Sequence, residues 1–281
     1  MTPAEILKRI ERLGPLGTLP TVAEKINQAV AQESCTPALL AAIIEKDAAL
    51  ATRVLKLANS SFYGLSRRVD TIPRAITVLG FNLVRDTALT VSVYRLFAGK
   101  SSDGCDIEGL WLHSLACAVA ARCLAARFDA GAAQHAFLGG VLHDIGILLL
   151  SRVFPEEMHT VCGSKCTTED LLTVERNTIG TTHPELGALA AECWHFPAAL
   201  VELIRCHHRP LAARHLPCSV AAVHAGNEIV KAMNLGKALS FYVGKIDPPV
   251  WQMLNIHAAD LPSLIRTIAK DFETARELFT G

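Results

Sequence analysis

The sequence has no excess of charge of either sign. Lysine and arginine together number 27 among the 281 residues, and aspartate and glutamate together also number 27. Proteins whose main partner is nucleic acid carry a basic face or stripe, which appears in the sequence as a surplus of lysine and arginine. The balance of charges therefore predicts a protein that does not bind nucleic acid.

Long apolar runs of the kind that cross a membrane are also missing. Histidine, aspartate, arginine or serine interrupts each run before it reaches the roughly 18 to 20 residues that a membrane span needs. The first segment, MTPAEILKRIERLG, has acids and bases in a helical pattern and lacks the apolar centre of a signal peptide. We therefore expect a soluble, cytoplasmic protein with no membrane partner.

Cysteine does not show the pattern of a disulfide framework. The nine cysteines are odd in number and are scattered through apolar helical stretches, which is typical of reduced, buried thiols. Only Cys162 and Cys166, in the segment CGSKC, are spaced closely enough to suggest a site. Two sulfurs do not complete a zinc site, so ordinary loop thiols are the preferred interpretation.

Alternating strand patterns are scarce, and there is no nucleotide-binding glycine loop. The segment FYVGKI at 241–246 is the one weak strand candidate, while nearly every other segment has apolar residues at helical spacing. The predicted fold class is therefore all-α. Glycine, serine and aspartate are frequent in 98–105, which we take as a linker between an N-terminal bundle of about five helices, 1–98, and a second helical domain, 106–281.

The apolar spacing and the capping residues give approximate bounds for the helices. In the first domain we expect helices at 6–13, 38–45, 48–58 and 74–97, and a further helix that starts after Pro20. Thr21 is the expected cap of the helix after Pro20, and Asp47 is the expected N-cap of the helix 48–58. In the second domain we expect helices at 108–127, 132–151, 168–177, 184–194, 198–208, 218–233 and 261–279.

Several polar residues of the second domain stand on apolar helix faces. His113 shares its face with small residues, which let another helix come close. His143 and Asp144 are adjacent in the middle of the apolar helix 132–151, where burying an ionisable pair is costly unless it is hydrogen-bonded, paired or bound to a metal. His183 lies beside a proline at the start of a helix, where a side chain can turn inward.

The pair His207 and His208 ends the predicted helix 198–208. His207 lines up with the apolar face of that helix, whereas His208 lines up with Arg205. Since residues of one helical face point the same way, we expect His207 to be the one that points inward.

These side chains allow two interpretations. Each histidine taken alone is best explained as a core residue hydrogen-bonded to a carbonyl group or a neighbour. Together, however, four histidines and one aspartate on successive helices form a ligand set for zinc, iron, manganese or nickel. Adjacent residues differ by about 100° around a helix, so His143 and Asp144 can serve one metal only if other helices complete the site.

The same residues carry a family resemblance. His113, the pair His143 and Asp144, His183 in HPELGALAA, and His207 with His208 resemble the metal-binding series of the HD superfamily of phosphohydrolases in order and spacing. The first domain contains LPTVAEKINQAV, IIEKDAALATRVLKLANSSFYG and IPRAITVLG, which resemble the N-terminal half of the HDOD family. The segment ANSSFYG, 58–64, is the most diagnostic piece.

This resemblance implies a bacterial helical output or signalling domain, and HDOD members are generally regarded as relatives that have lost catalysis. Two departures from the catalytic pattern agree with that view. Ile147 stands where catalytic relatives have a lysine after HD-x-G, and Asn227 stands where they have a late metal-binding aspartate. The GYP signature of relatives that degrade cyclic dinucleotides is absent after HHRP. His224, on the same face as Asn227, either approaches the site or is a hydrogen-bonded core histidine.

Three functions remain open on this basis. The first is a non-catalytic signalling protein that acts through protein partners, and the second is a metal-dependent phosphohydrolase acting on a nucleotide or cyclic dinucleotide. In the second case Asp144 would bridge metals or orient the attacking water. The third is a metal-binding module without turnover, with iron, manganese, zinc or nickel as candidate ions. We favour the first function, with the metal site retained, and the sequence leaves the oligomeric state open.

Overall fold

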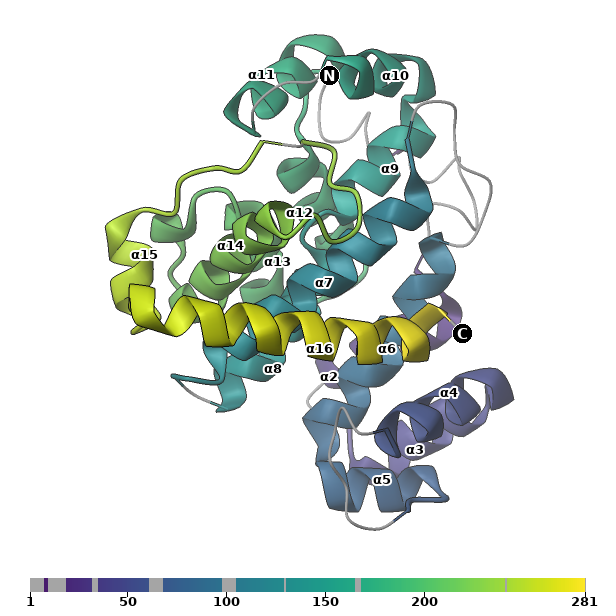
Figure 1. Ribbon diagram of the computed structural model, residues 1–281. Coiled ribbons are helices and arrows are strands. Elements are labelled where there is room, and N and C mark those ends of the chain that lie inside the picture. Colours follow the sequence, from purple (N-terminus) through teal and green to yellow (C-terminus); the bar gives the residue numbers. More distant parts are fainter. Residues whose placement is uncertain are drawn as a thin grey trace.

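The computed structural model describes residues 8–9, 19–31, 35–60, 68–97, 105–128, 130–164, 168–240 and 242–280 (Figure 1). Within these ranges every regular element is a helix and none is a strand, which confirms the all-α class. The weak strand prediction at 241–246 was wrong, because residues 242–246 form no regular element. Most of the expected first helix, 6–13, lies outside the described residues.

The N-terminal part consists of five described helices, and most of the predicted bounds and caps are correct. Asp47 caps α4 by accepting a hydrogen bond from the Leu50 amide at 2.9 Å, as expected, and also pairs with Arg95 of α6 at 2.6 Å. The helices are α2 (Thr21–Ala31), α3 (Pro37–Glu45), α4 (Ala48–Ala58), α5 (Ile72–Leu79) and α6 (Phe81–Phe97).

The prediction of one long helix over 74–97 was wrong. Gly80 has φ +88°, a left-handed conformation that a helix interior does not contain, and it divides the segment into α5 and α6. Glycine adopts this conformation without steric cost, so the break is encoded at a single residue. It lets α6 turn away from α5 and run towards the second part of the protein (Figure 1).

Asn59, in the diagnostic segment 58–64, connects the end of α4 to Val69 through side-chain hydrogen bonds. Its side-chain amide donates to the carbonyl groups of Leu55 and Val69, each at 2.7 Å, and its oxygen accepts from the Val69 amide at 2.7 Å. The two bonds to Val69 tie the end of α4 to the segment that precedes α5. Phe62, Tyr63 and Gly64 lie outside the described residues.

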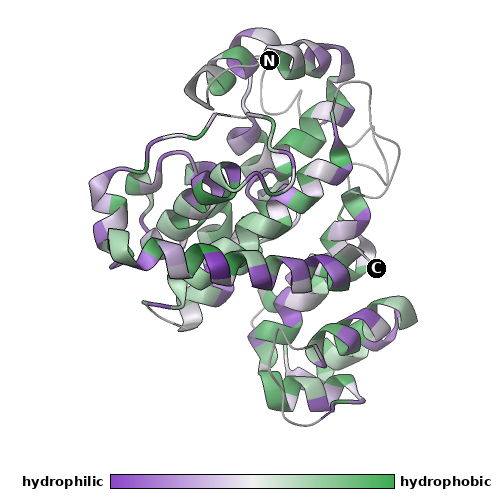
Figure 2. Ribbon diagram, viewed as in Figure 1, coloured by the Kyte–Doolittle hydropathy of each residue, from purple (hydrophilic) through white to green (hydrophobic). Residues whose placement is uncertain are grey.

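The second part is built around α7, whose side chains are buried along almost its whole length. Helices α8, α14 and α16 pack against α7, and α16 crosses it on the outside (Figure 1). Hydrophobic residues dominate α7, whereas α16 alternates hydrophobic and hydrophilic residues, as a covering helix should (Figure 2). The elements are α7 (Ile107–Ala125), α8 (Ala130–Leu142), α9 (Ile145–Val153), α10 (Pro155–Gly163), α11 (Thr168–Ile179), α12 (His183–Cys193), α13 (Ala198–Cys206), the short helix η2 (Pro210–Ala212), α14 (Pro217–Ala232), α15 (Pro248–Met253), η3 (Ala258–Asp260) and α16 (Leu261–Thr280).

Two central segments have the length and the apolar composition of a membrane span, although no such segment was expected from the sequence. They are Ile107–Ala125 and Gly131–Val153, and 78% and 89% of the respective 18-residue windows are buried inside the protein. Core helices of a globular fold pass the same test because they too are surrounded by apolar side chains. The packing accounts for the hydrophobicity of both segments.

The hydrophobic core runs without a break through both parts of the chain. Helix α6 packs on α2, α4 and α5 and also on α7 and α8, so it joins the two parts. The buried side chain of Asn27 in α2 donates to the carbonyl group of Trp194 at 3.1 Å and adds a second link. Most of the expected linker, 98–105, lies outside the described residues, and the division into 1–98 and 106–281 stays a prediction.

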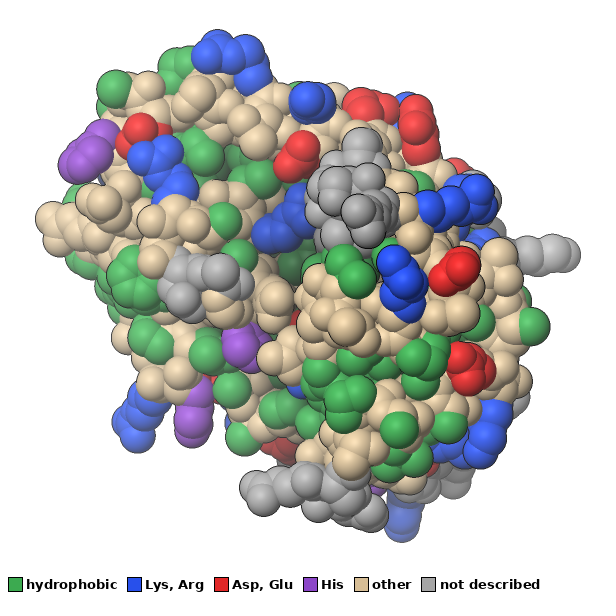
Figure 3. All heavy atoms as spheres, turned by 90° about the horizontal axis from the view of Figure 1, so that it is seen from below, with side chains coloured by type: hydrophobic (Ala, Val, Ile, Leu, Met, Phe, Trp, Pro, Cys, Tyr) green, Lys and Arg blue, Asp and Glu red, His purple; other side chains and the backbone are tan. Residues whose placement is uncertain are grey.

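The face seen from below carries hydrophobic side chains among charged ones (Figure 3). Two exposed hydrophobic residues, Leu39 and Val78, lie on α3 and α5, which pack against each other at this end of the molecule. The N-terminal helices therefore present apolar surface as well as charge to solvent.

Candidate metal centre

Close packing of α7 against its neighbours brings His113 into the interior. A Cβ on Gly140 of α8 would lie 2.4 Å from the Cα of Ala118, so only glycine permits this approach. His113 is buried, and its Nε2 lies 3.0 Å from Oδ1 of Asn227 on α14. The small residues around His113 therefore admit neighbouring helices, as the sequence predicts.

His143 and Asp144 do not stand in the middle of one helix, which corrects the prediction for 132–151. Helix α8 ends at Leu142 and α9 begins at Ile145, with the two residues in the turn between them. Asp144 has φ −100° and ψ 14°, outside the helical range. The turn removes the 100° separation of neighbours on a helix and lets both side chains face the same interior point.

Gly146, two residues further on, allows α12 to come up against this turn. A Cβ at Gly146 would lie 1.9 Å from the carbonyl oxygen of His183. No side chain fits there, so the glycine sets the distance between the start of α9 and the start of α12. His183 is thereby placed beside Asp144.

Three of the histidine rings are fixed through Nδ1. His143 donates to the carbonyl oxygen of Gly140 at 2.8 Å, and His207 donates to that of Ile204 at 2.7 Å. The Nδ1 of His183 lies 2.9 Å from both carboxylate oxygens of Glu175. Since these oxygens only accept, Nδ1 of each ring carries a proton, and Nε2 is the nitrogen that faces Asp144 and would bind a metal.

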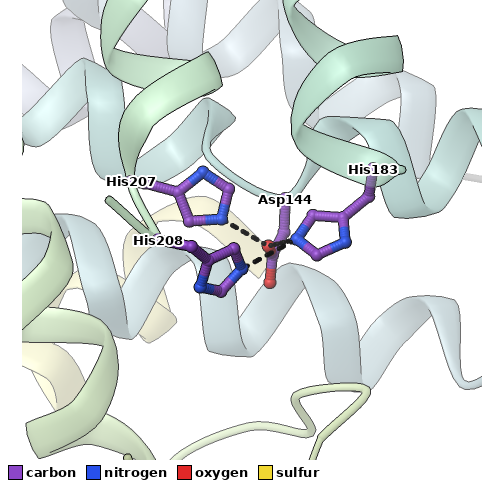
Figure 4. Close-up of side chains that lie close together, drawn as sticks. All are labelled: Asp144, His183, His207 and His208. Carbon is purple, nitrogen blue, oxygen red and sulfur yellow. Dashed lines mark hydrogen bonds and ion pairs between the residues drawn. The ribbon is translucent and has the colours of Figure 1, made fainter. Parts of the chain in front are cut away.

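The Nε2 atoms of four histidines surround Asp144. From the Asp144 carboxylate oxygens, Nε2 of His143 lies at 3.1 Å and Nε2 of His183 at 3.5 Å; the values for His207 and His113 are 3.6 and 3.7 Å. His183, His207 and His208 converge on the carboxylate from separate directions (Figure 4). We call these six residues, His113, His143, Asp144, His183, His207 and His208, the Asp144 cluster.

The ligand atoms of the cluster fall into two groups that share Asp144. One contains Asp144, His183, His207 and His208, the other contains His113, His143 and Asp144, and within each group the atoms lie within 4.8 Å of one another. A carboxylate has two oxygens and can serve both groups at once. The arrangement therefore offers donors for one cation or for two neighbouring cations.

His208 belongs to the cluster, against the expectation that His207 alone points inward. Helix α13 ends at Cys206, so both histidines lie in the turn after it and the helical spacing no longer applies. Nε2 of His208 lies 3.0 Å from Nε2 of His183. Two nitrogens that bind one ion at ~2.1 Å and at a right angle to each other are also ~3.0 Å apart.

His224 lies outside both ligand groups. Its Nδ1 donates to the carbonyl oxygen of His207 at 2.9 Å, so it supports the backbone of the turn that carries His207 and His208. The interpretation as a hydrogen-bonded histidine fits this contact. Asn227 is nearer the cluster, through its 3.0 Å contact with His113.

Burial and charge set the protonation of the cluster in the absence of a cation. Burial lowers the pKa of His113 and of His207 to about 4 and the pKa of His208 well below its ordinary value. Burial opposes ionisation of His143 and Asp144 as well, but their mutual attraction raises the pKa of His143 and lowers that of Asp144. A metal at His143 would displace its proton.

The cluster passes a direct test of fit to a metal. The buried Nε2 atoms of His143 and His207 have no directed hydrogen bond among the described residues, although both face Asp144. His143 still has an ion pair with Asp144 at 3.1 Å, whereas Nε2 of His207 lies 3.6 Å from the carboxylate. Because buried polar atoms are nearly always partnered, a cation fits as the missing partner of His207. Neutral imidazoles with one carboxylate suit transition metals.

Glu175 supports the cluster and has no counterpart among the residues expected from sequence. It is completely buried on α11 and accepts from both the backbone amide and the ring of His183, each at 2.9 Å. A carboxylate behind a metal-binding histidine fixes the ring and makes it a stronger donor. The sequence places Glu175 in a helix but gives no signal that this glutamate is buried.

A small cavity adjoins the cluster, with room for about one water. Its wall includes Asp144, His183 and His208, the expected apolar residue Ile147, and a cation, Lys231 of α14. Lys231 is buried and pairs with Glu228 at 3.0 Å. Lys231 therefore lies close to Ile147, which stands where the catalytic relatives have a lysine.

The described residues 234–240 and 242–247 form a strap, part of which lines this cavity. Ala238, Leu239 and Ser240 contribute to its wall, and the strap is fixed to α7 by a hydrogen bond of 2.8 Å from the Lys237 amide to the Gly109 carbonyl group. At its other end the Gly244 amide donates to Glu228 at 2.5 Å. The strap is thus held at both ends beside a cavity that has room for about one water.

Comparisons with known proteins agree with this architecture. The family model of the HDOD domain matches residues 16–210. A Geobacter sulfurreducens HDOD domain protein of unknown function has a TM-score of 0.77 and 23% identity, with 99% of both chains covered. A Marinobacter aquaeolei protein provisionally described as a signal transduction protein has a TM-score of 0.73 and 21% identity, covering 99% of this chain and 66% of the other.

Two further relatives extend the comparison. A Shewanella amazonensis protein provisionally described as a phosphohydrolase has a TM-score of 0.72 and 24% identity, with 98% of both chains covered. An uncharacterized protein of Treponema pallidum is 24% identical over 229 residues. Those residues are 80% of this chain but 44% of the Treponema protein, so the chain spans less than half the length of that relative.

Proposed function

The chain belongs to the HDOD family, and we propose that it is a non-catalytic signal-output protein that holds a divalent transition metal in the Asp144 cluster and acts through contacts with protein partners. The observation that carries the metal part is the convergence of five histidines on one buried carboxylate. The fold of a protein described as a signal transduction protein supports the signalling part.

The chemistry of the donors supports iron, manganese, zinc or nickel as the ion. Imidazole nitrogens with a carboxylate suit these metals, whereas calcium and magnesium prefer oxygen donors throughout. When bound, such a metal would lower the pKa of a coordinated water. The residues themselves orient the donors: Glu175 fixes His183, and the carbonyl groups of Gly140 and Ile204 fix His143 and His207.

Three features support the absence of turnover. Ile147 lines the cavity where the catalytic relatives carry a lysine, and Asn227 stands in place of an aspartate. The cavity has room for about one water, and residues of the strap form part of its wall. A phosphate ester is much larger than one water, so the wall of the cavity would have to move before the ester could reach the cluster.

One observation favours a second candidate, a metal-dependent phosphohydrolase with Asp144 as bridging ligand. Lys231 brings a buried cation to the cavity beside Ile147, and a cation there could hold a phosphate oxygen. The two candidates differ in turnover. Metal-loaded protein that hydrolyses a cyclic dinucleotide or nucleotide, with Lys231→Met abolishing the reaction, would replace the first candidate by the second.

Metal content tests the proposal directly. Purified protein, stripped with a chelator and then reloaded separately with iron, manganese, zinc and nickel, is expected to retain at least about one equivalent of one of them after desalting. Because the metal binds the folded state, the same ion should raise the midpoint of thermal unfolding, and the chelator should reverse the rise. Protein that takes up none of the four ions would disprove the metal part.

Replacing Glu175 by glutamine should weaken metal binding without removing a ligand. The glutamine side chain is neutral and has one acceptor oxygen, so it cannot replace the carboxylate that accepts from the amide and the ring of His183. We therefore expect the affinity for the metal to fall about 10- to 100-fold. Competition with a coloured chelator measures the change. Glu192→Gln is the matched control, since Glu192 lies at the other end of α12, is half exposed and pairs with Arg205. Equal affinities in the two variants would contradict the supporting role of Glu175.

A further inference from the structure

Two cysteines far apart in the sequence meet outside the Asp144 cluster. Cys105 lies just before α7, Cys162 lies in the last turn of α10, and their Sγ atoms are 2.7 Å apart. Other thiols of this protein stand further from their partners: Cys117 lies 3.6 Å from the Val223 carbonyl oxygen and Cys123 lies 3.8 Å from Asp271. The pair is therefore unusually close for two free thiols.

The distance between the two Sγ atoms is only slightly longer than a disulfide bond. A disulfide has its sulfurs ~2.05 Å apart, so bond formation needs a movement of well under 1 Å from the observed contact. Both cysteines are free in the structure, Cys105 buried and Cys162 partly exposed. Partial exposure of one sulfur gives a small oxidant a point of attack, while the other is already in place to complete the reaction.

We propose that Cys105 and Cys162 form a reversible disulfide, and that this pair is a thiol-based modification site of the protein. The site takes a small disulfide of the glutathione class as its oxidant. From the sequence, only the spacing of Cys162 and Cys166 suggested a site, and ordinary loop thiols were the preferred interpretation. Cys166 lies outside the described residues.

The reaction balances as two thiol–disulfide exchanges. The Cys162 thiolate attacks one sulfur of glutathione disulfide, forms a mixed disulfide and releases one glutathione thiolate. Cys105 then loses its proton and attacks the Cys162 sulfur, which releases the second glutathione. One protein disulfide and two molecules of reduced glutathione result, so the protein loses two electrons and two protons to the small disulfide. The hydrogen bond that Cys162 sulfur receives from Cys105 lowers the pKa of Cys162, which favours the first step.

The link would enclose the part of the chain that carries half of the Asp144 cluster. The sulfurs are 57 positions apart, and the loop between them contains α7, α8 and α9 with His113, His143 and Asp144. It also ties α10 to the start of α7, and α10 packs on α11, which carries Glu175. Oxidation would therefore link the start of α7 to α10 covalently without modifying any ligand residue of the Asp144 cluster.

Peptide mapping of oxidised wild-type protein tests the site. After treatment with glutathione disulfide and alkylation of the remaining thiols, trypsin should yield peptide 101–122 joined to peptide 153–165, and dithiothreitol should separate them. Lys165 places Cys166 on the next peptide, so a link from Cys166 has a different mass. The midpoint of thermal unfolding should rise by roughly 5 to 10 °C on oxidation.

Variants assign the link to its two sulfurs. Cys105→Ser and Cys162→Ser should each abolish the linked peptides and the rise in midpoint, which also excludes Cys117 on peptide 101–122. Cys193→Ser, which removes an exposed cysteine outside the pair, should leave both unchanged. Oxidised wild-type protein without the linked peptides, or with Cys162 joined to Cys166, would overturn the proposal. The result does not depend on metal binding.

Discussion

Replacing Asp144 by asparagine is expected to cause the largest loss of metal binding of any single substitution in the chain. Asp144 is the only carboxylate in either ligand group and is common to both, so the change removes the anion from every donor set at once. Since loss of a supporting partner alone costs about 10- to 100-fold in affinity, we expect at least about 100-fold here.

The change should be measured as the stabilisation that metal provides. At a metal concentration about 100 times Kd, binding stabilises the wild-type fold by about 2.7 kcal/mol, and a 100-fold weaker variant at the same concentration retains about 0.4 kcal/mol. The difference between unfolding midpoints with and without metal reports this value. Asp271→Asn is the matched control, because Asp271 is partly exposed on α16 and pairs with Arg122. A variant at Asp144 that keeps the full metal-dependent rise would disprove the assignment of the cluster.

Replacing Gly146 by alanine should destabilise the whole fold and the site together. The new Cβ would lie 1.9 Å from the carbonyl oxygen of His183 and 2.7 Å from its carbonyl carbon. These are backbone atoms that no rotamer change can move, so α9 and α12 must separate. We expect a loss of about 3 kcal/mol or more in the free energy of unfolding, measured by denaturant titration.

Gly163→Ala controls for the change of residue type. Gly163 also lies in a helix, α10, but a Cβ there would meet no atom within 4 Å. Alanine is the better helix former, so this variant should be unchanged or more stable by up to about 1 kcal/mol. Because displacement of α12 also moves His183, Gly146→Ala should weaken metal binding as well. Equal stability of the two variants would show that α9 and α12 tolerate separation.

The types and order of the ligand residues were readable from the sequence, because an ionisable side chain on an apolar face is visible in a periodic pattern. His113 and the small residues around it behave as that pattern predicts. The pattern fails where the helix ends. His208 was assigned outward by extending the spacing of α13 beyond Cys206, and the turn that follows brings it inward.

Supporting residues were less visible for a different reason. Glu175 lies on a helix whose sequence is mostly polar, so its burial depends on what α11 packs against and not on its own neighbours. Lys231 likewise looks like an ordinary charge near the end of a helix, yet it lines the cavity next to Asp144. Such residues are identified only when segments distant in sequence are placed side by side.

The sequence by itself determined the all-α class, most helix positions, the family and the set of histidines with Asp144, because apolar spacing and residue chemistry are local properties. Tertiary structure decided the rest. It broke the apolar stretch 132–151 at His143 and Asp144, since only a turn there lets two neighbours face one point while Gly146 admits the start of α12. It also placed Cys105 beside Cys162 and Glu175 behind His183. The two cysteines are 57 positions apart and Glu175 and His183 lie on different helices, so both contacts depend on how helices pack and no local pattern encodes them.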